Sequence, residues 1–490
     1  MDLDVAACYR AFRTRDARFD GRLFSGVKTT GIYCRPVCPA RTPRPENMLF
    51  FTTAAAAQEA GFRPCLRCRP ETAPNLAAWR GTSNTVNRGL SLIEAGALDQ
   101  SDVRSLAGRL GVGDRQLRRL FQAHLGASPA SVAQTRRVLL ALQLLHETRL
   151  PIADVALAAG FRSIRRFNEV FQALFARPPG ALRRGGPRAP VAAPPGHVEI
   201  LLRYRPPYDW PAMLGFLQAR AMPGVETISS GRYARTIEAS GLHGLVIVEP
   251  ADDDALKATI HFPRLAALPP IIDRLRRVFD LAADPRAIAG QLAEDALLAP
   301  LVAARPGLRV PGAWDGFELA VRAVLGQQIT VRGAASLAGK LVLAYGAPLS
   351  RSSRLVDGLT HVFPRAERLA SADISTLGMP RSRAQTLTTL AAAVAADPGM
   401  FGVGQHPAEC LKRLRAIPGI GEWTAQYIAM RELREPDAFP ADDLGLRRAL
   451  AARGRRPTPR EMVARAERWR PWRAYAAQHL WTSLSPHSTT

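Results

Sequence analysis

Alternating apolar and polar residues mark one stretch of the chain as rich in strands. Residues 197–204, 232–239, 243–250 and 257–262 each alternate between the two kinds of side chain. Because successive side chains of a strand point to opposite faces of a sheet, this period predicts antiparallel strands with one buried face. A helical pattern lies between the first two runs, at residues 211–222. We therefore expect an α+β domain of about 100 residues.

Earlier in the chain, between Thr82 and about Arg184, apolar residues recur with a helical period. A first helix-turn-helix pattern in this segment turns at Gly111. Its expected inward side chains are Leu106, Ala107, Leu110, Leu117, Leu120 and Phe121, and its expected exposed arginines are Arg115, Arg118 and Arg119. The second pattern turns through Ala156, Gly160 and Phe161, and Arg162, Arg165, Arg166 and Asn168 lie on the following helix. Apolar periodicity alone would also fit a plain helical bundle.

Residues 304–485 also have a helical period, interrupted by P-G-I-G at residues 418–421. Pro418, Gly419 and Gly421 permit a tight hairpin between two helices. Its backbone N–H groups can hold a DNA phosphate without reading sequence, and its carbonyls can bind a monovalent cation. This predicts a helix-hairpin-helix, a motif that many DNA-binding proteins share.

The chain has 490 residues, too many for one compact domain. Residues 183–197 are dense in Gly, Pro and Ala and read as an extended linker. We expect a multidomain protein, mainly α with α+β parts. The expected regions are 1–78, 82–185, the linker 186–197, 198–303 and 304–485.

The formal net charge is +24, with a pI near 11.0. The first 185 residues contain 28 Lys and Arg against 14 Asp and Glu, and the rest is basic as well. Such a balance predicts salt-sensitive attraction to a polyanion, although an Arg- and Ala-rich composition can also reflect genomic base composition. No apolar run approaches a membrane span and no signal-peptide core is present, so we expect a cytoplasmic, nucleoid-associated protein without a membrane partner.

Four of the six cysteines are clustered as C-x3-C and C-x2-C: Cys34, Cys38, Cys65 and Cys68. Two close thiol pairs in a cytosolic chain favour one tetrahedral Zn²⁺ over disulfides. The surrounding region has few large apolar residues, so the metal would contribute to its folding. Cys8 and Cys410 lie apart and are expected to be ordinary thiols.

Residues 29–51 (TTGIYCRPVCPARTPRPENMLFF) and 60–70 (AGFRPCLRCRP) resemble the N-terminal domain of the Ada adaptive-response regulators. The resemblance implies that Cys34 takes a methyl group from a methyl phosphotriester in DNA. A zinc-bound thiolate is a soft nucleophile suited to such a carbon. Methylation would remove one negative charge and strengthen DNA binding. A purely architectural zinc module is the alternative.

The ordered pair of helix-turn-helix units, with its G-F-x-S turn, resembles the AraC-type DNA-binding domain, whose recognition helices enter successive major grooves. That resemblance implies promoter DNA as a partner, with RNA polymerase as a further expected partner. Residues 203–226 (RYRPPYDWPAMLGFLQARAMPGVE) resemble the N-terminal domain of AlkA-type 3-methyladenine DNA glycosylases. There Phe216 matches an aromatic residue that reaches towards the base pocket, although sequence alone would make it a core residue.

The helix-hairpin-helix DNA glycosylase superfamily places its catalytic aspartate 20 residues after the position of Trp423, which maps the role to Asp443 in FPADDLGLRR. The implied reaction is hydrolysis of an N-glycosidic bond, with an ionised carboxylate stabilising positive charge at C1′. Asp442 is interpreted as a helix N-terminal residue that binds backbone N–H groups; the reverse assignment is the alternative. Bifunctional relatives carry a lysine where Trp423 stands, so base excision without strand cleavage is expected.

Trp423 and Tyr427 share one helical face, and Trp481 in HLWTSL matches another pocket residue of AlkA-like enzymes. An aromatic pocket would attract a cationic base such as 3-methyladenine or 7-methylguanine by stacking and cation-π interaction. Gln327 and Gln328 lie where the superfamily inserts a wedge into DNA, but AlkA has an apolar wedge there.

The combined expectation is an Ada-type sensor and transcription factor followed by a glycosylase that acts on alkylated double-stranded DNA. The chain lacks the Pro-Cys-His-Arg motif of the second methyltransferase domain of Ada, so repair of O6-methylguanine is not expected. The alternative from another class is a transcriptional regulator with an inactive glycosylase-like domain that binds DNA.

Overall fold

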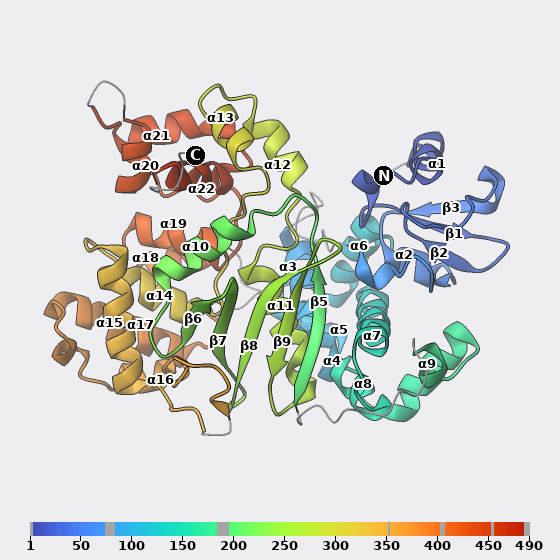
Figure 1. Ribbon diagram of the computed structural model, residues 1–490, viewed down its shortest axis with the longest axis horizontal. Coiled ribbons are helices and arrows are strands. Elements are labelled where there is room, and N and C mark those ends of the chain that lie inside the picture. The colour runs from blue at the N-terminus through green and yellow to red at the C-terminus, as the bar shows by residue number, and fades with distance from the viewer. Residues whose placement is uncertain are drawn as a thin grey trace. The chain divides into compact units, whose positions relative to one another are not determined.

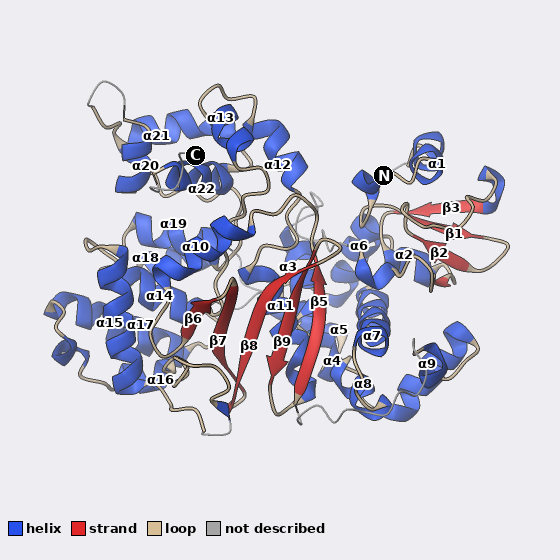
Figure 2. Ribbon diagram, in the orientation of Figure 1, coloured by secondary structure: helices blue, strands red, loops and turns tan. Residues whose placement is uncertain are grey.

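The computed structural model describes residues 3–73, 84–183, 196–350, 353–401, 407–451 and 455–484. They belong to two compact units, Met1–Tyr204 with Arg264–Asp273 and Arg205–Pro263 with Arg274–Thr490. Helices occur throughout, and the strands are few (Figures 1 and 2). The expected multidomain, mainly helical architecture with α+β parts is confirmed. Of the expected linker, residues 184–195 lie outside the described residues, and His197 already begins a strand.

The first unit opens with a small sheet whose strand order is β3-β1-β2-β4. Its elements are α1 (Val5–Arg13), η1 (Ala17–Phe19), β1 (Phe24–Val27), β2 (Ile32–Cys34), η2 (Pro45–Asn47), β3 (Met48–Phe51), α2 (Ala54–Glu59), β4 (Arg63–Pro64) and η3 (Pro70–Thr72). Phe24, Tyr33, Ala57 and Phe62 form a compact core. A Cβ at Gly26 would lie 2.7 Å from the Phe62 ring, so glycine lets that ring cover the sheet.

The two predicted helix-turn-helix units follow in the same compact unit. Their helices are α3 (Asn84–Glu94), α4 (Ala97–Gln100), α5 (Val103–Arg109), α6 (Asp114–Leu125), α7 (Pro129–Glu147), α8 (Ile152–Ala158), α9 (Ile164–Phe175) and η5 (Pro179–Leu182). Gly111 and Gly160 have positive φ at the expected turns. Gly160 also lacks room for a side chain, because a Cβ there would lie 2.3 Å from Asp99. The predicted inward residues are buried except Leu120, which is half-buried.

All four predicted strands form, as β5 (His197–Arg203), β7 (Arg232–Ala239), β8 (Leu242–Ala251) and β9 (Ala255–His261). A further strand, β6 (Glu226–Ser229), pairs antiparallel with β7, which pairs with β8, which pairs with β9. The predicted helix is α10 (Trp210–Arg220), and Asp209 caps its N-terminus through a hydrogen bond from the Ala212 N–H.

The second unit continues as a succession of helices. They are α11 (Leu268–Val278, preceded by η6, Leu265–Ala267), α12 (Pro285–Leu292), α13 (Leu298–Ala304), α14 (Gly316–Leu325), α15 (Val331–Tyr345), α16 (Ala366–Ala370), η8 (Ile374–Leu377), α17 (Arg381–Ala396), α18 (Pro407–Arg415), α19 (Glu422–Arg431), α20 (Leu444–Ala449), α21 (Pro459–Ala466), η9 (Glu467–Trp469) and α22 (Arg473–Ser483). The first residues of α11 and all of η6 belong to the first unit.

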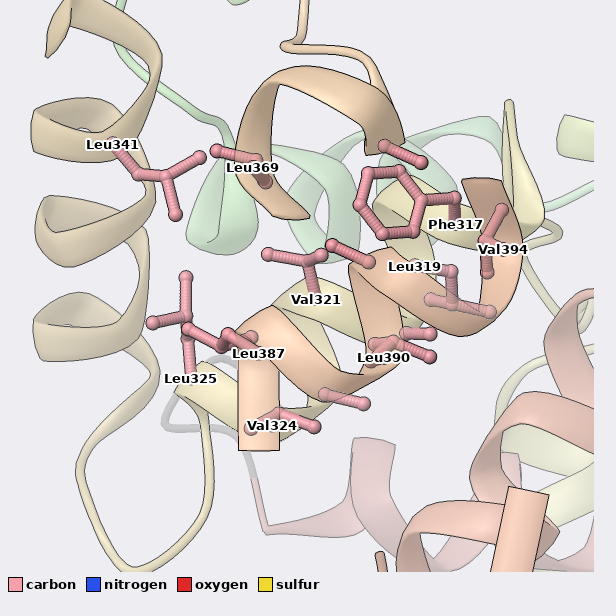
Figure 3. Packing of buried hydrophobic residues seen from close by; sticks show 14 of the residues in the cluster. Phe317, Leu319, Val321, Val324, Leu325, Leu341, Leu369, Leu387, Leu390 and Val394 are labelled. Atoms are coloured by element: carbon pink, nitrogen blue, oxygen red, sulfur yellow. The ribbon is translucent and has the colours of Figure 1, made fainter. Parts of the chain in front are cut away.

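Helix α14 is the centre of the largest apolar core described here (Figure 3). It is capped by Asp315, and its side chains are buried against α15, α16 and α17 through residues such as Leu341, Leu369 and Leu387. Nine of its ten residues are buried, all but Arg322, so the helix cannot shift without opening this core. The loop that leaves its C-terminal end, which carries Gln327 and Gln328, therefore starts from a fixed point.

Candidate active site and metal centre

Asp443 lies at the N-terminus of α20 with both carboxylate oxygens engaged. The indole N–H of Trp423 donates to Oδ2 at 2.9 Å, and that of Trp481 donates to Oδ1 at 2.8 Å. Oδ1 also accepts from the Leu446 N–H at 2.9 Å, which makes Asp443 the N-cap of α20. The role expected of Asp442 is therefore corrected: Asp442 is exposed, and the carboxylate that caps the helix is Asp443.

Gly445 keeps the neighbourhood of this carboxylate open. A Cβ at position 445 would lie 2.9 Å from Asp443 Oδ1 and 3.2 Å from Cδ1 of Trp481. Since both atoms belong to the hydrogen-bonded group, a side chain there would push the carboxylate and the indole apart. No motif or spacing in the sequence marks Gly445 as part of the site.

The aromatic residues expected in the pocket come together around Asp443. Trp423 and Tyr427 stack with ring centroids 5.3 Å apart and planes inclined by 11°. The edge of Trp481 approaches Tyr427 at 6.4 Å between centroids, with an angle of 66°. The three rings are half-buried, so each keeps an accessible part.

Phe216 on α10 joins this group through arginines. The Arg431 guanidinium lies 4.7 Å from the centroid of the Phe216 ring and 5.3 Å from that of Tyr427. The Arg220 guanidinium lies 3.8 Å from the Phe216 centroid. Segments about 200 residues apart in the chain thus line one place, and Phe216 is half-buried rather than a core residue.

The hydroxyl of Tyr427 accepts a hydrogen bond from Arg431 Nη1 at 2.6 Å. Arg431 is itself fixed, since its other nitrogens donate to the carbonyls of Pro311 and Gly312 at 2.9 and 3.0 Å. Burial acts to raise the pKa of the Tyr427 phenol, but the positive charges of Arg431 and Arg220 outweigh it and the pKa lies below its usual value.

The hairpin expected at residues 418–421 joins α18 to α19. Gly419 has a φ of +89°, and a Cβ there would lie 2.1 Å from the hydroxyl oxygen of Thr386. That hydroxyl donates to the Pro418 carbonyl at 3.0 Å. Position 419 therefore requires glycine both for its backbone angle and for its contact with α17.

Gln327 binds the hairpin. Its amide nitrogen donates to the Gly419 carbonyl at 2.9 Å and to the Thr424 hydroxyl at 3.0 Å, and its own backbone carbonyl accepts from Arg383 at 2.5 Å. Gln328 differs from it, because it is exposed and has a φ of +58°. Of the two glutamines expected at a wedge, the structure leaves only Gln328 projecting from the loop.

The four clustered cysteines meet as expected. Their sulfur atoms all lie within 4.8 Å of one another, and a tetrahedral Zn²⁺ with bonds of about 2.3 Å needs sulfur separations of about 3.8 Å. The donor set therefore fits zinc. Cys38, Cys65 and Cys68 are buried, whereas Cys34, at the end of β2, is half-exposed.

Cys8 and Cys410 lie apart from this cluster and are buried. Burial raises the pKa of both thiols, that of Cys410 to about 12. They are the ordinary thiols expected from the sequence.

Arg35, next to Cys34, ties the two cysteine pairs together. Its backbone N–H donates to Cys68 Sγ at 3.4 Å, and its guanidinium donates to the Cys68 carbonyl at 3.0 Å and to the Thr72 hydroxyl at 2.5 Å. It also forms a buried ion pair with Asp20. The C-R-P element contained this residue, but the spacing of the cysteines gave it no role.

The arginines expected on the helix-turn-helix surface are exposed: Arg115, Arg118, Arg162, Arg165 and Arg166. Arg165 also pairs with Glu169 at 2.9 Å, on the same helix. Arg162 is held more firmly, because its guanidinium donates to the carbonyls of Asp99 and Ser101 at 2.9 and 3.0 Å.

Comparison with family models divides the chain in four. The metal binding domain of Ada matches residues 7–71, a helix-turn-helix domain matches 106–185, and the AlkA N-terminal domain matches 199–315. The model of the HhH-GPD superfamily base excision DNA repair protein matches 321–474. In the described part of the chain, no helix has the length and apolar character to cross a bilayer.

A Mycobacterium tuberculosis protein, described as a probable bifunctional transcriptional activator/DNA repair enzyme AlkA, is 43% identical over 486 residues, or 99% of this chain and 97% of that protein. The chain belongs to this bifunctional AlkA family. DNA-3-methyladenine glycosylase 2 of Escherichia coli is 38% identical over 288 residues, which cover 57% of this chain and 95% of that enzyme. The solved 3-methyladenine DNA glycosylase of Archaeoglobus fulgidus shares the fold, with a TM-score of 0.51 and 22% identity over 58% of this chain and 99% of its own.

In this member of the bifunctional AlkA family, sequence reasoning missed three arginines and one glycine that lie at the two sites: Arg35, Arg220, Arg431 and Gly445. Arg220 and Arg431 lie in helical segments, where a charged residue is expected to face solvent, so their positions in the sequence did not indicate a site. Arg35 lies inside a recognised motif, and only that adjacency could have pointed to it.

Proposed function

We propose that this chain is an alkylation-damage response protein with two activities. One is a methyl-activated, DNA-binding transcriptional regulator. The other is a monofunctional DNA glycosylase that hydrolyses the N-glycosidic bond of alkylated bases such as 3-methyladenine and 7-methylguanine in base excision repair. The observation that carries the glycosylase assignment is the Asp443 carboxylate, held by two indoles among stacked aromatic rings within the segment matched by the HhH-GPD superfamily.

In the proposed reaction Asp443 is the catalytic residue. As the base leaves, positive charge develops at C1′ of the sugar, and an ionised carboxylate beside it lowers the energy of that state. The indole donors of Trp423 and Trp481 fix both oxygens before substrate arrives, so little reorganisation is needed during the reaction. An inactive, DNA-binding domain would not need this arrangement.

Phe216, Trp423, Tyr427 and Trp481 are proposed to line the base pocket. A base cannot enter between Trp423 and Tyr427, because their centroids are 5.3 Å apart and two successive stacking distances amount to about 6.8 Å. The base therefore packs against the free parts of these rings. Trp423 cannot form a Schiff base, so the abasic product is expected to remain uncut.

Gly419 and Gly421 are proposed to present hairpin N–H groups to a DNA phosphate. Gln327 would hold the hairpin against the preceding loop, and Gln328 would enter the gap left by the flipped base. A monovalent cation at the hairpin carbonyls is compatible with the contacts described, because a carbonyl oxygen that accepts one hydrogen bond keeps a second lone pair.

In the first unit Cys34, Cys38, Cys65 and Cys68 would hold one Zn²⁺. Zinc keeps coordinating thiols deprotonated at neutral pH. Cys34, the most exposed of the four, is the proposed methyl acceptor: its sulfur attacks the methyl carbon, and the phosphotriester departs as a phosphodiester anion. The thioether formed is neutral, so the repulsion between this region and DNA decreases.

Arg115, Arg118, Arg162, Arg165 and Arg166 are proposed to contact promoter DNA from the helix-turn-helix units. Methylation of Cys34 would then increase promoter affinity, and RNA polymerase would be the partner that reads the bound state. The fixed geometry of Arg162 suits a contact to phosphate rather than an adaptable contact to bases.

The test is to incubate the full chain with methylated duplex DNA, analyse released bases by chromatography and weigh the intact protein from the same tube. We expect free 3-methyladenine and a protein heavier by one methyl group. Cys34→Ala should abolish the mass gain and leave base release unchanged, and Cys410→Ala is the matched control. Methyl uptake by Cys34→Ala would refute the acceptor assignment, and absence of base release by the wild type would refute the glycosylase.

A further inference from the structure

Helix α7 binds the backbone of β5 through two side chains. Gln143 Nε2 donates to the Leu201 carbonyl at 2.7 Å, and Glu147 Oε2 accepts from the Leu201 N–H at 3.0 Å. Gln143 and Glu147 are four residues apart and so lie on one face of the helix, where Gln143 also donates to Glu147 at 3.0 Å. Both backbone polar groups of Leu201 are thus satisfied by α7, as a neighbouring strand would satisfy them.

This contact lies where two descriptions of the chain differ. The AlkA N-terminal domain matches from residue 199 onward, but the chain up to Tyr204 belongs to the first compact unit, together with the helix-turn-helix helices. The first strand of the AlkA-type part is therefore held by the regulator part. The interaction surface is the face of α7 formed by Gln143 and Glu147, and its partner is β5.

The other oxygen of the same carboxylate faces the Ada-type metal-binding region, residues 7–71. Glu147 Oε1 accepts from Arg69 Nη2 at 3.4 Å, and Arg69 directly follows Cys68. Arg69 Nε also donates to Glu71 at 2.9 Å, and Glu71 forms a hydrogen bond with Nδ1 of His146 at 3.0 Å. The metal-binding region therefore contacts two consecutive residues of α7.

Glu147 is largely buried between these partners. Its side chain is 8% exposed, and that of Arg69 is 19% exposed. A carboxylate in such a place depends on the donors around it, and groups that share one carboxylate influence one another. If Arg69 moves away, Glu147 loses a guanidinium partner and gains a reason to turn towards water. The hydrogen bond to the Leu201 N–H would then weaken.

The position of Arg69 depends in turn on the cysteine cluster. Its φ is +50°, a value that a residue other than glycine adopts only where surrounding contacts hold it. Its N–H donates to the Cys65 carbonyl at 3.1 Å, and its carbonyl accepts from the Arg35 guanidinium at 3.3 Å. Cys65 and Cys68 both belong to the proposed zinc ligands, so a bound metal would fix the turn that carries Arg69.

We propose that the face of α7 formed by Gln143 and Glu147 is the surface through which the metal-binding region controls the order of β5. Metal on the four cysteines keeps Arg69 against Glu147, and Glu147 keeps β5 in place. The inference rests on the proposed zinc centre. It adds a connection between that centre and the first strand of the AlkA-type part.

The test is hydrogen exchange of the full chain, measured by mass spectrometry on peptides that cover residues 197–203, before and after a chelator removes zinc. In the wild type, chelation should speed exchange at Leu201 by about tenfold or more, because a protected amide opens more often once its acceptor is released. Glu147→Gln keeps an oxygen for the Leu201 N–H but cannot pair with Arg69. Chelation should therefore change exchange in this variant by less than about twofold.

Glu169→Gln is the matched control, because Glu169 is exposed and pairs with Arg165 of its own helix. It should respond to chelation as the wild type does. Peptides within residues 7–71 should exchange faster after chelation in every variant, which verifies that the metal has left.

An unchanged rate at Leu201 after chelation of the wild type would overturn the proposal, and so would an equal effect in Glu147→Gln. The first result needs no variant and holds even where Glu147→Gln fails to fold. Failure of the proposed zinc centre is a different result, because metal analysis of the purified chain would then find no zinc. That finding would refute the centre, and the inference with it, before any exchange is measured.

Discussion

The indole nitrogen of Trp481 lies 2.8 Å from a carboxylate oxygen of Asp443. The two residues are 38 positions apart, on α22 and at the start of α20. This hydrogen bond, with that from Trp423 on α19, makes the carboxylate a meeting point of three helices. The orientation of the proposed catalytic group thus depends on how those helices pack.

Asp443→Asn should lower base release by at least about a hundredfold while preserving DNA binding, because the neutral amide cannot stabilise positive charge at C1′. The amide NH₂ would also face one of the two indole N–H donors. Asp442→Asn is the matched control, since Asp442 is exposed and should retain activity. Single-turnover release and a filter-binding assay check the two quantities. Equal losses in both variants would contradict the assignment.

Gly445→Ala should reduce base release about tenfold or more with little loss of stability. The added Cβ would lie 2.9 Å from Asp443 Oδ1, and displacement of a catalytic group by even a fraction of an ångström is costly. Gly290→Ala on α12 is the control, because a Cβ there meets nothing within 4 Å. The measurement is the release rate alongside the thermal midpoint. Full activity in Gly445→Ala would show that the carboxylate tolerates movement.

Gly419→Ala should weaken binding of the glycosylase unit to DNA irrespective of sequence. The alanine would need a φ of +89° and would place Cβ 2.1 Å from the Thr386 hydroxyl oxygen, so the hairpin must move. Gly378→Ala separates the two causes, since its φ is +83° but no atom lies within 4 Å. The readout is KM for base release from duplexes of different sequence. Similar KM values for both variants would point to backbone strain alone.

Glu432 should give the glycosylase unit a pH-dependent stability. Burial, together with nearby Asp315, raises the pKa of this carboxyl to about 7 against the opposing charge of Arg277. Between its unfolded pKa of about 4.3 and about 7, the folded state holds a proton that the unfolded chain has lost. The free energy of unfolding therefore falls as pH rises through that window, by at most about 4 kcal/mol, and is level above it.

Glu432→Gln should remove this dependence and raise the free energy of unfolding near pH 8, because it replaces a buried charge by a neutral group of similar shape. The exposed Glu367→Gln is the control. Calorimetric unfolding of the full chain at several pH values between about 5 and 8 measures the effect on the transition of the glycosylase unit. A wild type whose stability rises over this range would contradict the prediction.

Much of this architecture follows from sequence periodicity. The strand that begins at Arg232 was predicted with its observed bounds, although its five successive residues from Tyr233 to Ile237 are all buried, so that both of its faces are covered and not one as expected. The short strand Glu226–Ser229 was not, since four residues offer too few alternations to detect. Asp443 could be placed from its distance to Trp423, but the assignment of the helix cap to Asp442 was wrong by one residue.

Contacts between distant segments set the limit of such reasoning. Nothing in the sequence indicates that Arg431 lies between Phe216 and Tyr427, because the first ring comes from a helix about 200 residues earlier. Gln327 is a second case: a polar residue in an exposed loop was expected to face DNA, but its amide binds the hairpin at Gly419. The residue type alone does not show whether a polar side chain finds its hydrogen-bond partners within the protein or in a bound ligand.

The indole contacts to Asp443 have a practical consequence. Tryptophan emission depends on the charge and polarity around the ring, and two of the seven tryptophans donate to this one carboxylate. The site therefore contains its own optical reporter. A base that enters beside these rings should alter the fluorescence before any bond is broken, so that base flipping can be followed in time with unlabelled protein and DNA.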